Sequence, residues 1–457
     1  MHLVNLTTAG LKRIVGLSFA LFIYSMTFAQ ENSPYSRYGL GDIVLNQNIA
    51  NRGMGGVAIA DANIFNINFT NPASLGILKS KDRSTNTIFD IGVEIDRRTL
   101  KSTTSTAKYT ATNSLISYLQ IAFPIASKKM EKKGINWGLS FGLRPLTRIN
   151  YKIEKNERLP TTDSLNTLYE GTGGLNQFNI STGVKIKNFS FGLSSGYTFG
   201  NKDYSSQLVV ENDTVVHLKS NTQTTSNFGG IFLNAGIQYQ ARLNRAGYLS
   251  LGTYANMQQN LKARQDHVNE TFAFDGSGGI TPIDTVSSKT NEAGRVKLPA
   301  TVGIGLIYQD SSYHWKLGVD FEFSNWKNYS YYGYRDTVQN SWILRVGAEY
   351  YPAKMNTPNK KYWSFVKYRA GFYVGPDYVK LDKTRINYAA TLGATFPLTN
   401  IALLYRGGDE KQYVQLHTSI EYGGRGDKNS FSFRENTLRF NFGISMNARW
   451  FQKRSYY

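Results

Sequence analysis

The chain has 457 residues, among them 30 Tyr, 26 Phe and 42 Gly, and it carries a formal net charge of +20 with no Cys at all. The lack of Cys excludes disulfide bridges and thiolate metal sites, and no stretch after residue 30 is long and apolar enough for a helical membrane span. The 52 Lys and Arg are dispersed, which argues against nucleic-acid binding and favours attraction to anionic lipid headgroups. A transmembrane β-barrel remains compatible with these values because its strands are apolar only at alternate residues.

Residues 1–29 have the parts of a secretory signal peptide. Two basic residues, Lys12 and Arg13, precede an apolar run over residues 14–26, and a small residue, Ala29, ends the segment. The apolar run is too short for a membrane anchor, and it lacks a flanking charge that would stop transfer. We therefore predict that this segment is cleaved and that the mature chain is exported.

Residues 30–86 are predicted to form a hatch, or plug, in the lumen of a barrel. Gly and Pro interrupt any long strand here, and a barrel of about fourteen strands leaves a lumen unless something fills it. The Gly cluster lacks the following Lys-Ser/Thr and the strand-to-helix context of a phosphate loop, so we do not predict phosphate binding. The hatch residues expected to matter are Gly53, Gly55, Gly56, Asn71, Pro72 and Ala73.

Residues 87–457 are predicted to form an all-β, antiparallel outer-membrane barrel. Over residues 438–450, apolar side chains occupy every even position, and polar or small residues occupy the odd ones. A run of this length crosses a bilayer at a tilt, whereas strands of soluble sandwiches usually stop after five or six residues. The same alternation predicts about fourteen strands, at 87–99, 112–125, 135–150, 175–187, 188–200, 227–242, 246–262, 297–309, 313–326, 341–352, 363–376, 384–397, 411–424 and 436–451.

The predicted connections alternate between short turns and long loops. The long loops are 151–174, 201–226, 263–296 and 425–435. Because such barrels have short periplasmic turns and long external loops, we expect both termini in the periplasm. The segment 398–410 is long for an inner turn and breaks this rule.

Two sets of residues within the barrel are candidates for function. Pro145 with Gly142 nearby is predicted either to kink the third strand and open a lateral exit or to lie harmlessly above the membrane. Charged residues on the lumen face either hold a ligand carboxylate through an Arg or form a cross-strand ladder of ion pairs, and interleaving of acids and bases favours the ladder. These lumen charges are Asp320, Glu322, Arg345, Glu349 and Arg369. The Tyr-rich stretch 329–334 is expected in an external loop, either as a capture surface for apolar solutes or as an interfacial anchor.

The sequence gives little support for catalysis. The five His are scattered, no pair has metal-ligand spacing, and no Gly-x-Ser-x-Gly elbow is present. We therefore predict a protein that is not an enzyme and has no metal and no cofactor.

The order of several motifs resembles the long-chain fatty-acid transporter (FadL/TodX) family of outer-membrane proteins. The matching stretches are 52–61, 71–75, 298–305 and 345–350. The resemblance implies a fourteen-stranded barrel plugged by an N-terminal hatch, and passage of hydrophobic small molecules with a sideways exit. The residues after Trp450 depart from the pattern, since such barrels often stop at an aromatic residue in the last strand. We predict a monomeric passive transporter that contacts outer-membrane lipid. The alternative is a non-transporting interaction protein that partners surface or secretion-system proteins.

Overall fold

A computed structural model describes residues 33–79, 85–101, 108–158, 164–211, 217–243, 246–275, 279–353, 361–381, 384–399, 413–426 and 434–450. The predicted signal peptide, most of the segment 398–410 and the residues after Trp450 lie outside these ranges.

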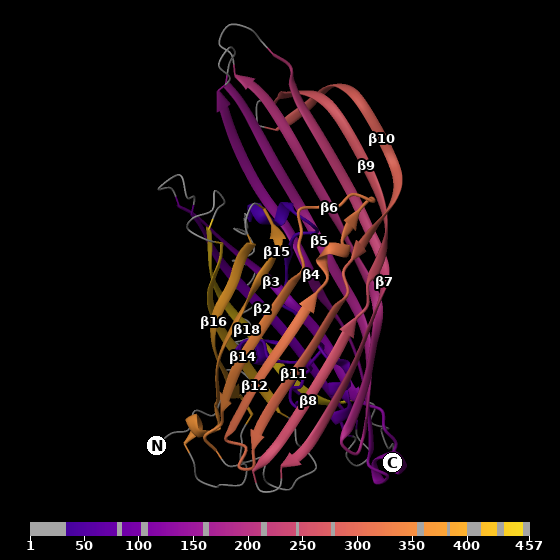
Figure 1. Ribbon diagram of the computed structural model, residues 1–457, viewed down its shortest axis with the longest axis vertical. Coiled ribbons are helices and arrows are strands. Elements are labelled where there is room, and N and C mark those ends of the chain that lie inside the picture. The colour runs from indigo at the N-terminus through magenta and orange to yellow at the C-terminus, as the bar shows by residue number, and fades with distance from the viewer. Residues whose placement is uncertain are drawn as a thin grey trace, which may run out of the picture.

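The described chain forms a closed antiparallel β-barrel (Figure 1). Each wall strand pairs with its neighbours along the chain, and the last strand pairs with the first, from Arg434↔Lys101 to Trp450↔Thr85. The wall has fourteen strands, as predicted, when β8 with β9 and β10 with β11 are each taken as one interrupted strand. The wall strands are β2 (Thr85–Lys101), β3 (Lys108–Pro124), β4 (Ile135–Arg158), β5 (Ser164–Ile186), β6 (Phe189–Glu211), β7 (Lys219–Leu243), β8 (Gly247–Asn256), β9 (Gln259–Phe274), β10 (Ile280–Leu298), β11 (Thr301–Asp310), β12 (Trp315–Ser324), β14 (Ser341–Tyr350), β15 (Lys367–Lys380), β16 (Thr384–Pro397), β17 (Val414–Arg425) and β18 (Arg434–Trp450).

The two faces of the wall differ as the alternation requires. Apolar side chains such as Leu392, Ile420 and Phe442 are exposed on the outside, whereas Glu421 and Asn441 on the same strands are buried inside. An apolar outer band around a polar interior is the arrangement of a transmembrane barrel of the outer membrane. No helix in the described part of the chain is long and apolar enough to cross a membrane.

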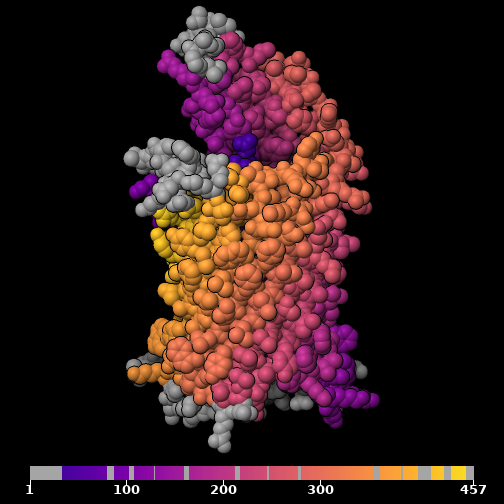
Figure 2. All heavy atoms as spheres, in the orientation of Figure 1, coloured from indigo at the N-terminus to yellow at the C-terminus, as the bar shows by residue number. Residues whose placement is uncertain are grey.

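Three of the predicted long loops are instead strands, and this is the main correction to the sequence analysis. From Thr147↔Leu175 to Arg158↔Ser164, β4 pairs with β5 in one register, and β6 pairs with β7 in the same way up to Leu208↔Ser220. The pair β9–β10 extends with three register shifts. Outside the membrane neither face of a strand meets lipid, so the period-two apolar signal is lost although the residues still favour strands. We call these extensions the half-shell; its described residues are 147–158, 164–175, 200–211, 217–228, 261–275 and 279–296. It rises over one side of the mouth (Figures 1 and 2).

The half-shell defines two ends of the barrel. The hairpin end carries the half-shell, and the turn end carries the short connections, including Lys187–Asn188 between β5 and β6. A short helix, α3 (Lys128–Lys132), and a 3-10 turn, η4 (Tyr362–Phe365), also lie in turn-end connections.

Residues 33–79, the inner segment, run through the interior of the barrel. They form η1 (Pro34–Arg37), β1 (Asp42–Ile43), α2 (Ile49–Arg52) and η2 (Pro72–Ile77), and most of their side chains are buried. Their backbone lies directly against glycines of the wall: a Cβ on Gly371 would come within 2.2 Å of the Gly55 nitrogen. Glycine is the residue that permits so close an approach of two backbones. The wall glycines of this kind are Gly138, Gly183, Gly192, Gly252, Gly347, Gly371 and Gly393.

The mouth at the hairpin end is closed by an apolar cluster. The connection between β12 and β14 contains η3 (Trp326–Asn328) and β13 (Ser330–Tyr331) and folds inward. Its Trp326 packs with Leu40 of the inner segment and with Tyr378 of β15. We call this group, completed by Leu175, Phe228, Leu261, Ala263, Val296, Leu298, Tyr329 and Val379, the sealing cluster.

The Tyr-rich stretch belongs largely to this seal. Tyr331 and Tyr334 exchange backbone hydrogen bonds of 2.9 Å around a two-residue turn. Tyr332 in that turn has φ 50°, which is uncommon for a bulky residue, and its ring lies against Gly294 of the half-shell. Tyr334 is 78% exposed. In this turn, a freely exposed surface for the capture of apolar solutes is therefore reduced to the ring of Tyr334.

Candidate functional site

The wall of the barrel has an opening in its hydrogen-bond ladder between β3 and β4. Among the described residues these strands pair only over 119–124 of β3 and 138–143 of β4. Farther toward the hairpin end β3 remains paired with β2, and β4 remains paired with β5. We call the unpaired stretch between residues 108–118 and 144–158 the seam. At the seam the described strands β3 and β4 are not joined by a hydrogen-bond ladder.

Pro145 lies at the start of the seam. Its pairing with Asn176 is followed by a register shift, so that Thr147 pairs with Leu175. Proline has no N–H to donate to a ladder, and prolines in sheets occur at edges and bulges. Gly142 lies in the regular, paired part of β4. The irregularity of the strand thus lies at Pro145, and Gly142 shows no kink of its own.

The inner segment partly fills the seam. β1 pairs antiparallel with residues 147–148 of β4, and the N–H of Val44 donates to the Leu146 carbonyl at 2.9 Å. The side chain of Ile43 is 48% exposed. A strand of two residues therefore takes the place that β3 would have in a continuous wall.

Ion pairs hold this strand from two sides. The Asp42 carboxylate accepts hydrogen bonds from Arg98 of β2 at 2.5 Å and from Arg425 of β17 at 2.9 Å. Nearby, the Ser33 hydroxyl donates to Glu435 at 2.9 Å. The described inner segment thus begins near the rim of the hairpin end, whereas β18 ends at the turn end. The described chain does not bring its two ends together, and both true termini lie outside the described residues.

A cavity of about 260 Å³ lies beside the seam, between the inner segment and the sealing cluster. Leu146 of β4 and Ile43 border it at the seam, and Trp326 with Tyr378 border it at the mouth. We call it the outer cavity. Its lining combines apolar side chains with a few charged ones, the usual composition of a small-molecule site.

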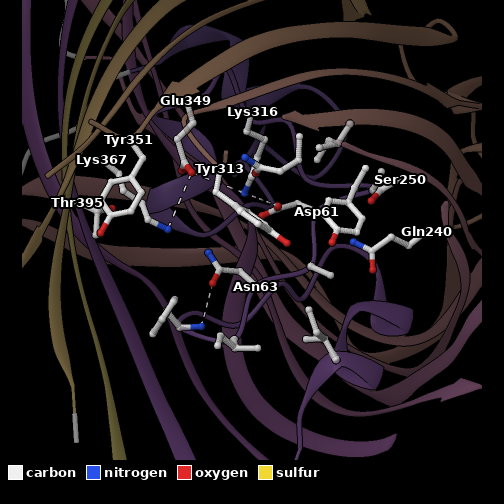
Figure 3. A pocket seen from close by; sticks show the side chains of 18 of the residues that line it. Asp61, Asn63, Gln240, Ser250, Tyr313, Lys316, Glu349, Tyr351, Lys367 and Thr395 are labelled. Carbon is white, nitrogen blue, oxygen red and sulfur yellow. Dashed lines mark hydrogen bonds and ion pairs between the residues drawn. The ribbon is translucent and has the colours of Figure 1, made fainter. Parts of the chain in front are cut away.

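A second cavity, of about 410 Å³, lies at the turn end (Figure 3). The Lys316 ammonium lies 3.1 Å from Asp61 of the inner segment and 3.9 Å from Glu349. Lys367 lies 4.0 Å from the same Glu349. Tyr313 extends across this space in the close-up view. These charged side chains at the cavity are paired with one another. The pair between Lys316 and Asp61 joins the wall to the inner segment.

The predicted lumen charges lie together but do not line an empty channel. Asp320 accepts hydrogen bonds from the backbone N–H groups of Ala58 and Ile59 at 2.7 and 2.9 Å, so it anchors the inner segment. Glu322 accepts from Arg345 at 3.2 Å, and Glu349 pairs with Arg369 at 2.6 Å. Each of these five residues therefore has a partner in the protein.

The predicted hatch residues lie where the inner segment meets the wall. Asn71 caps η2 by accepting from the Ala73 N–H at 3.1 Å, and its amide donates to the Ile59 carbonyl at 2.8 Å. Pro72 begins η2. Gly53, Gly55 and Gly56 lie against β14, β15 and β16. Gly55 and Gly56 have φ of 70° and 82°, a conformation that favours glycine.

Sequence reasoning did not predict that Arg52 pairs the inner segment with acids of the wall. Arg52 donates to Glu94 at 2.5 Å and to Glu421 at 2.6 Å, and all three side chains are buried. Arg144 was also missed, although it lies on the polar face of a predicted strand. The sequence does show an Arg within the Gly-rich segment and acids on the lumen faces of the strands. No local sequence pattern, however, indicates that this Arg and these acids form ion pairs. No group of three or more His, Asp or Glu able to hold a metal occurs among the described residues.

A family model described as BamG matches residues 11–457. The chain belongs to the BamG family. No curated protein matches this BamG-family chain by sequence.

Solved structures share the fold of this BamG-family barrel at low sequence identity. A Pseudomonas aeruginosa FadL homologue is 13% identical, with a TM-score of 0.55, over 90% of this chain and 99% of that one. The Ralstonia pickettii toluene transporter TbuX is 14% identical, with a TM-score of 0.51, over 89% and 99% of the two chains. The Pseudomonas putida toluene transporter TodX is 14% identical, with a TM-score of 0.51, over 90% and 100%. The motif resemblance thus predicted the fold, while the family that the sequence matches is BamG.

Proposed function

We propose that this BamG-family barrel takes up hydrophobic small molecules across the outer membrane and passes them sideways through the seam. The observation that carries the proposal is the missing ladder between β3 and β4 directly beside the outer cavity. In this arrangement the half-shell faces outside and the turn end faces the periplasm, as short turns do in such barrels.

Several features support a lateral route over an axial one. The sealing cluster closes the mouth at the hairpin end, and the inner segment fills the lumen below it. Within the described ranges, β1 and its neighbour Val44 occupy the seam and contribute few backbone hydrogen bonds. An apolar molecule moving between the outer cavity and lipid has less structure to displace at the seam than along the barrel axis. The inner segment then acts as the hatch, with β1 as its movable part.

The seam is tested by replacing Pro145, which lies at its start. Pro145→Val supplies a backbone N–H and removes the cause of the irregularity, so we expect several-fold slower uptake of a labelled alkane by cells. Pro124→Val is the matched control, because Pro124 lies in the paired part of the same strand interface. Unchanged uptake by Pro145→Val at normal expression would contradict a lateral route.

The half-shell favours a second candidate function, that of a non-transporting interaction protein at the cell surface. Transport through the seam does not need strands that extend so far beyond the rim, and β10 over residues 280–295 is paired on one side only among the described residues. A deletion strain separates the two functions. Loss of alkane or fatty-acid uptake supports transport, whereas normal uptake with missing surface proteins supports the interaction role.

A further inference from the structure

Several cations gather on the outer face of β9 and β10, where the half-shell leaves the wall. Along β9, Lys262 and Arg264 alternate with two residues of the sealing cluster, and along β10, Arg295 and Lys297 do the same. Successive side chains of a strand point to opposite faces, so these four cations point outward, and all four are exposed. Together with the exposed cation of η3 they form a group that we call the basic patch: Lys262, Arg264, Arg295, Lys297 and Lys327.

The strand register brings like charges of the patch together. Lys262 lies directly opposite Arg295 in the antiparallel pair. Arg264 and Lys297 lie in the flanking rows, where their partners across the ladder are uncharged. Like charges directly opposite each other destabilise a sheet, so the central pair gains stability from any anion that binds between the two side chains.

Acids do not balance the basic patch, in contrast to the lysines elsewhere on the half-shell. On β4 and β5, Lys152 pairs with Glu170 and Lys155 pairs with Glu157. Within the described ranges, none of the five patch cations lies in an ion pair. The next acid along this face of β9, Asp266, accepts a backbone hydrogen bond of 2.6 Å. The patch therefore keeps an excess of positive charge for external anions.

The patch lies directly beyond the apolar band of the wall. Ile231 of β7 faces outward and is 73% exposed, and Gly229, two residues nearer the hairpin end, pairs with Lys262. Two residues of a strand rise about 7 Å. On the side of η3, the paired and exposed Phe323 and Trp342 belong to the same edge of the band. Cations at this height meet lipid headgroups rather than acyl chains.

A groove of about 1050 Å³ continues from the patch along η3 and the Tyr-rich turn. Arg295, Lys297 and Lys327 line it. Two exposed amides and an exposed ring also line it, those of Gln258, Asn328 and Tyr334. Side-chain amides both donate and accept hydrogen bonds, and the tyrosine ring combines an apolar face with a polar hydroxyl. These groups suit the hydroxyls and C–H faces of a sugar beside an anionic group.

We infer that the basic patch binds the phosphorylated sugar headgroup of an outer-leaflet glycolipid that carries two phosphates. A phosphate held between Lys262 and Arg295 leaves the cations of the flanking rows, about 13 Å apart along the strands, for a second phosphate. The guanidinium groups suit phosphate because they donate two parallel hydrogen bonds. The bound lipid anchors the base of the half-shell in the outer leaflet. This inference goes beyond solute uptake and shares with it only the orientation that places the half-shell outside.

The test is equilibrium binding to the full chain in a neutral detergent, where orientation in a membrane plays no part. Three probes are compared: bisphosphorylated lipid A, monophosphorylated lipid A with the same acyl chains, and cardiolipin, which has two phosphates and no sugar. We expect bisphosphorylated lipid A to bind about tenfold or more tightly than either of the others, as one more charge-assisted contact implies. Its binding should weaken as salt is added, because the cations are exposed.

The variants separate the patch from the general charge of the chain. Lys262→Gln combined with Arg295→Gln should lower the affinity for bisphosphorylated lipid A about tenfold or more. Lys152→Gln combined with Lys155→Gln removes the same charge from exposed positions of the half-shell and should leave that affinity unchanged.

Three results would overturn the inference. They are equal binding of the two lipid A forms, binding of cardiolipin as tight as that of bisphosphorylated lipid A, and a loss of affinity in the control as large as in the patch variant. None of these results bears on alkane uptake through the seam, which the Pro145→Val experiment tests separately.

Discussion

Replacing Arg52 with Met removes the cation that joins the inner segment to the wall. Arg52 lies between Glu94 of β2 and Glu421 of β17, with its Nη1 and Nε at 2.5 and 2.6 Å from their carboxylates. Met keeps much of the apolar volume of the side chain, so the main effect is the loss of charge. Two buried carboxylates then face the space that the guanidinium occupied.

The structure sets the size of the expected effect. Breaking a buried ion pair by removing one partner typically costs about 3–5 kcal/mol. Arg439 remains near both acids, at 3.8 Å from Glu94 and 3.5 Å from Glu421, and offsets part of the loss. We therefore expect the lower limit, about 3 kcal/mol, which corresponds to roughly a hundredfold increase in local opening of the inner segment.

Hydrogen–deuterium exchange of the full chain in detergent measures this opening. The reporters are the backbone amides of residues 52–56, where the N–H groups of Arg52, Gly53 and Gly56 donate to residues 48–51. Removing the acids as well, in Arg52→Met with Glu94→Gln and Glu421→Gln, should restore most of the protection because no unpaired charge is left. Lys152→Met is the surface control, since its pair with Glu170 is exposed and worth at most about 1 kcal/mol.

This account would be refuted if the backbone amides of residues 52–56 in Arg52→Met exchanged at a rate within threefold of that in the unmodified chain. It would mean that the glycine contacts and the other hydrogen bonds hold the inner segment without the ion pairs. Equal acceleration in Lys152→Met would instead show that the assay reports general loosening of the barrel.

Two further predictions concern the wall and the seal. Gly371→Ala places a methyl group 2.2 Å from the Gly55 nitrogen, so limited proteolysis should cut the inner segment much faster, whereas Gly424→Ala, with its nearest atom at 3.2 Å, should behave like the unmodified chain. Burial raises the pKa of Tyr332 to about 12, so the folded state favours the neutral phenol. The stability that it adds is complete below the unfolded pKa near 10 and is lost as the pH rises through about 12. The absorbance titration of the unmodified chain minus that of Tyr332→Phe should have its midpoint near 12, and a midpoint near 10 would contradict the docked ring.

The sequence was informative wherever the membrane imposes a pattern. Along β18, lipid on one side and the lumen on the other enforce alternation, so both the strand and its inward face were predictable from residues 438–450 alone. The Gly and Pro of the inner segment likewise predicted a non-strand element. The half-shell was missed because neither face of residues 151–158 and 164–174 meets lipid, so the apolar alternation of a membrane strand is not imposed there.

The alternating pattern, and with it the number of membrane strands, is a local property that the amino-acid sequence determined by itself. Which side chains meet was decided only by the tertiary structure. Arg52 and Glu421 are 369 residues apart in the chain, and closure of the barrel, rather than any feature of their neighbours in sequence, brings them together. The seam has the same origin, because β4 and β3 each keep their other partner and the register of the closed wall decides where the two strands separate.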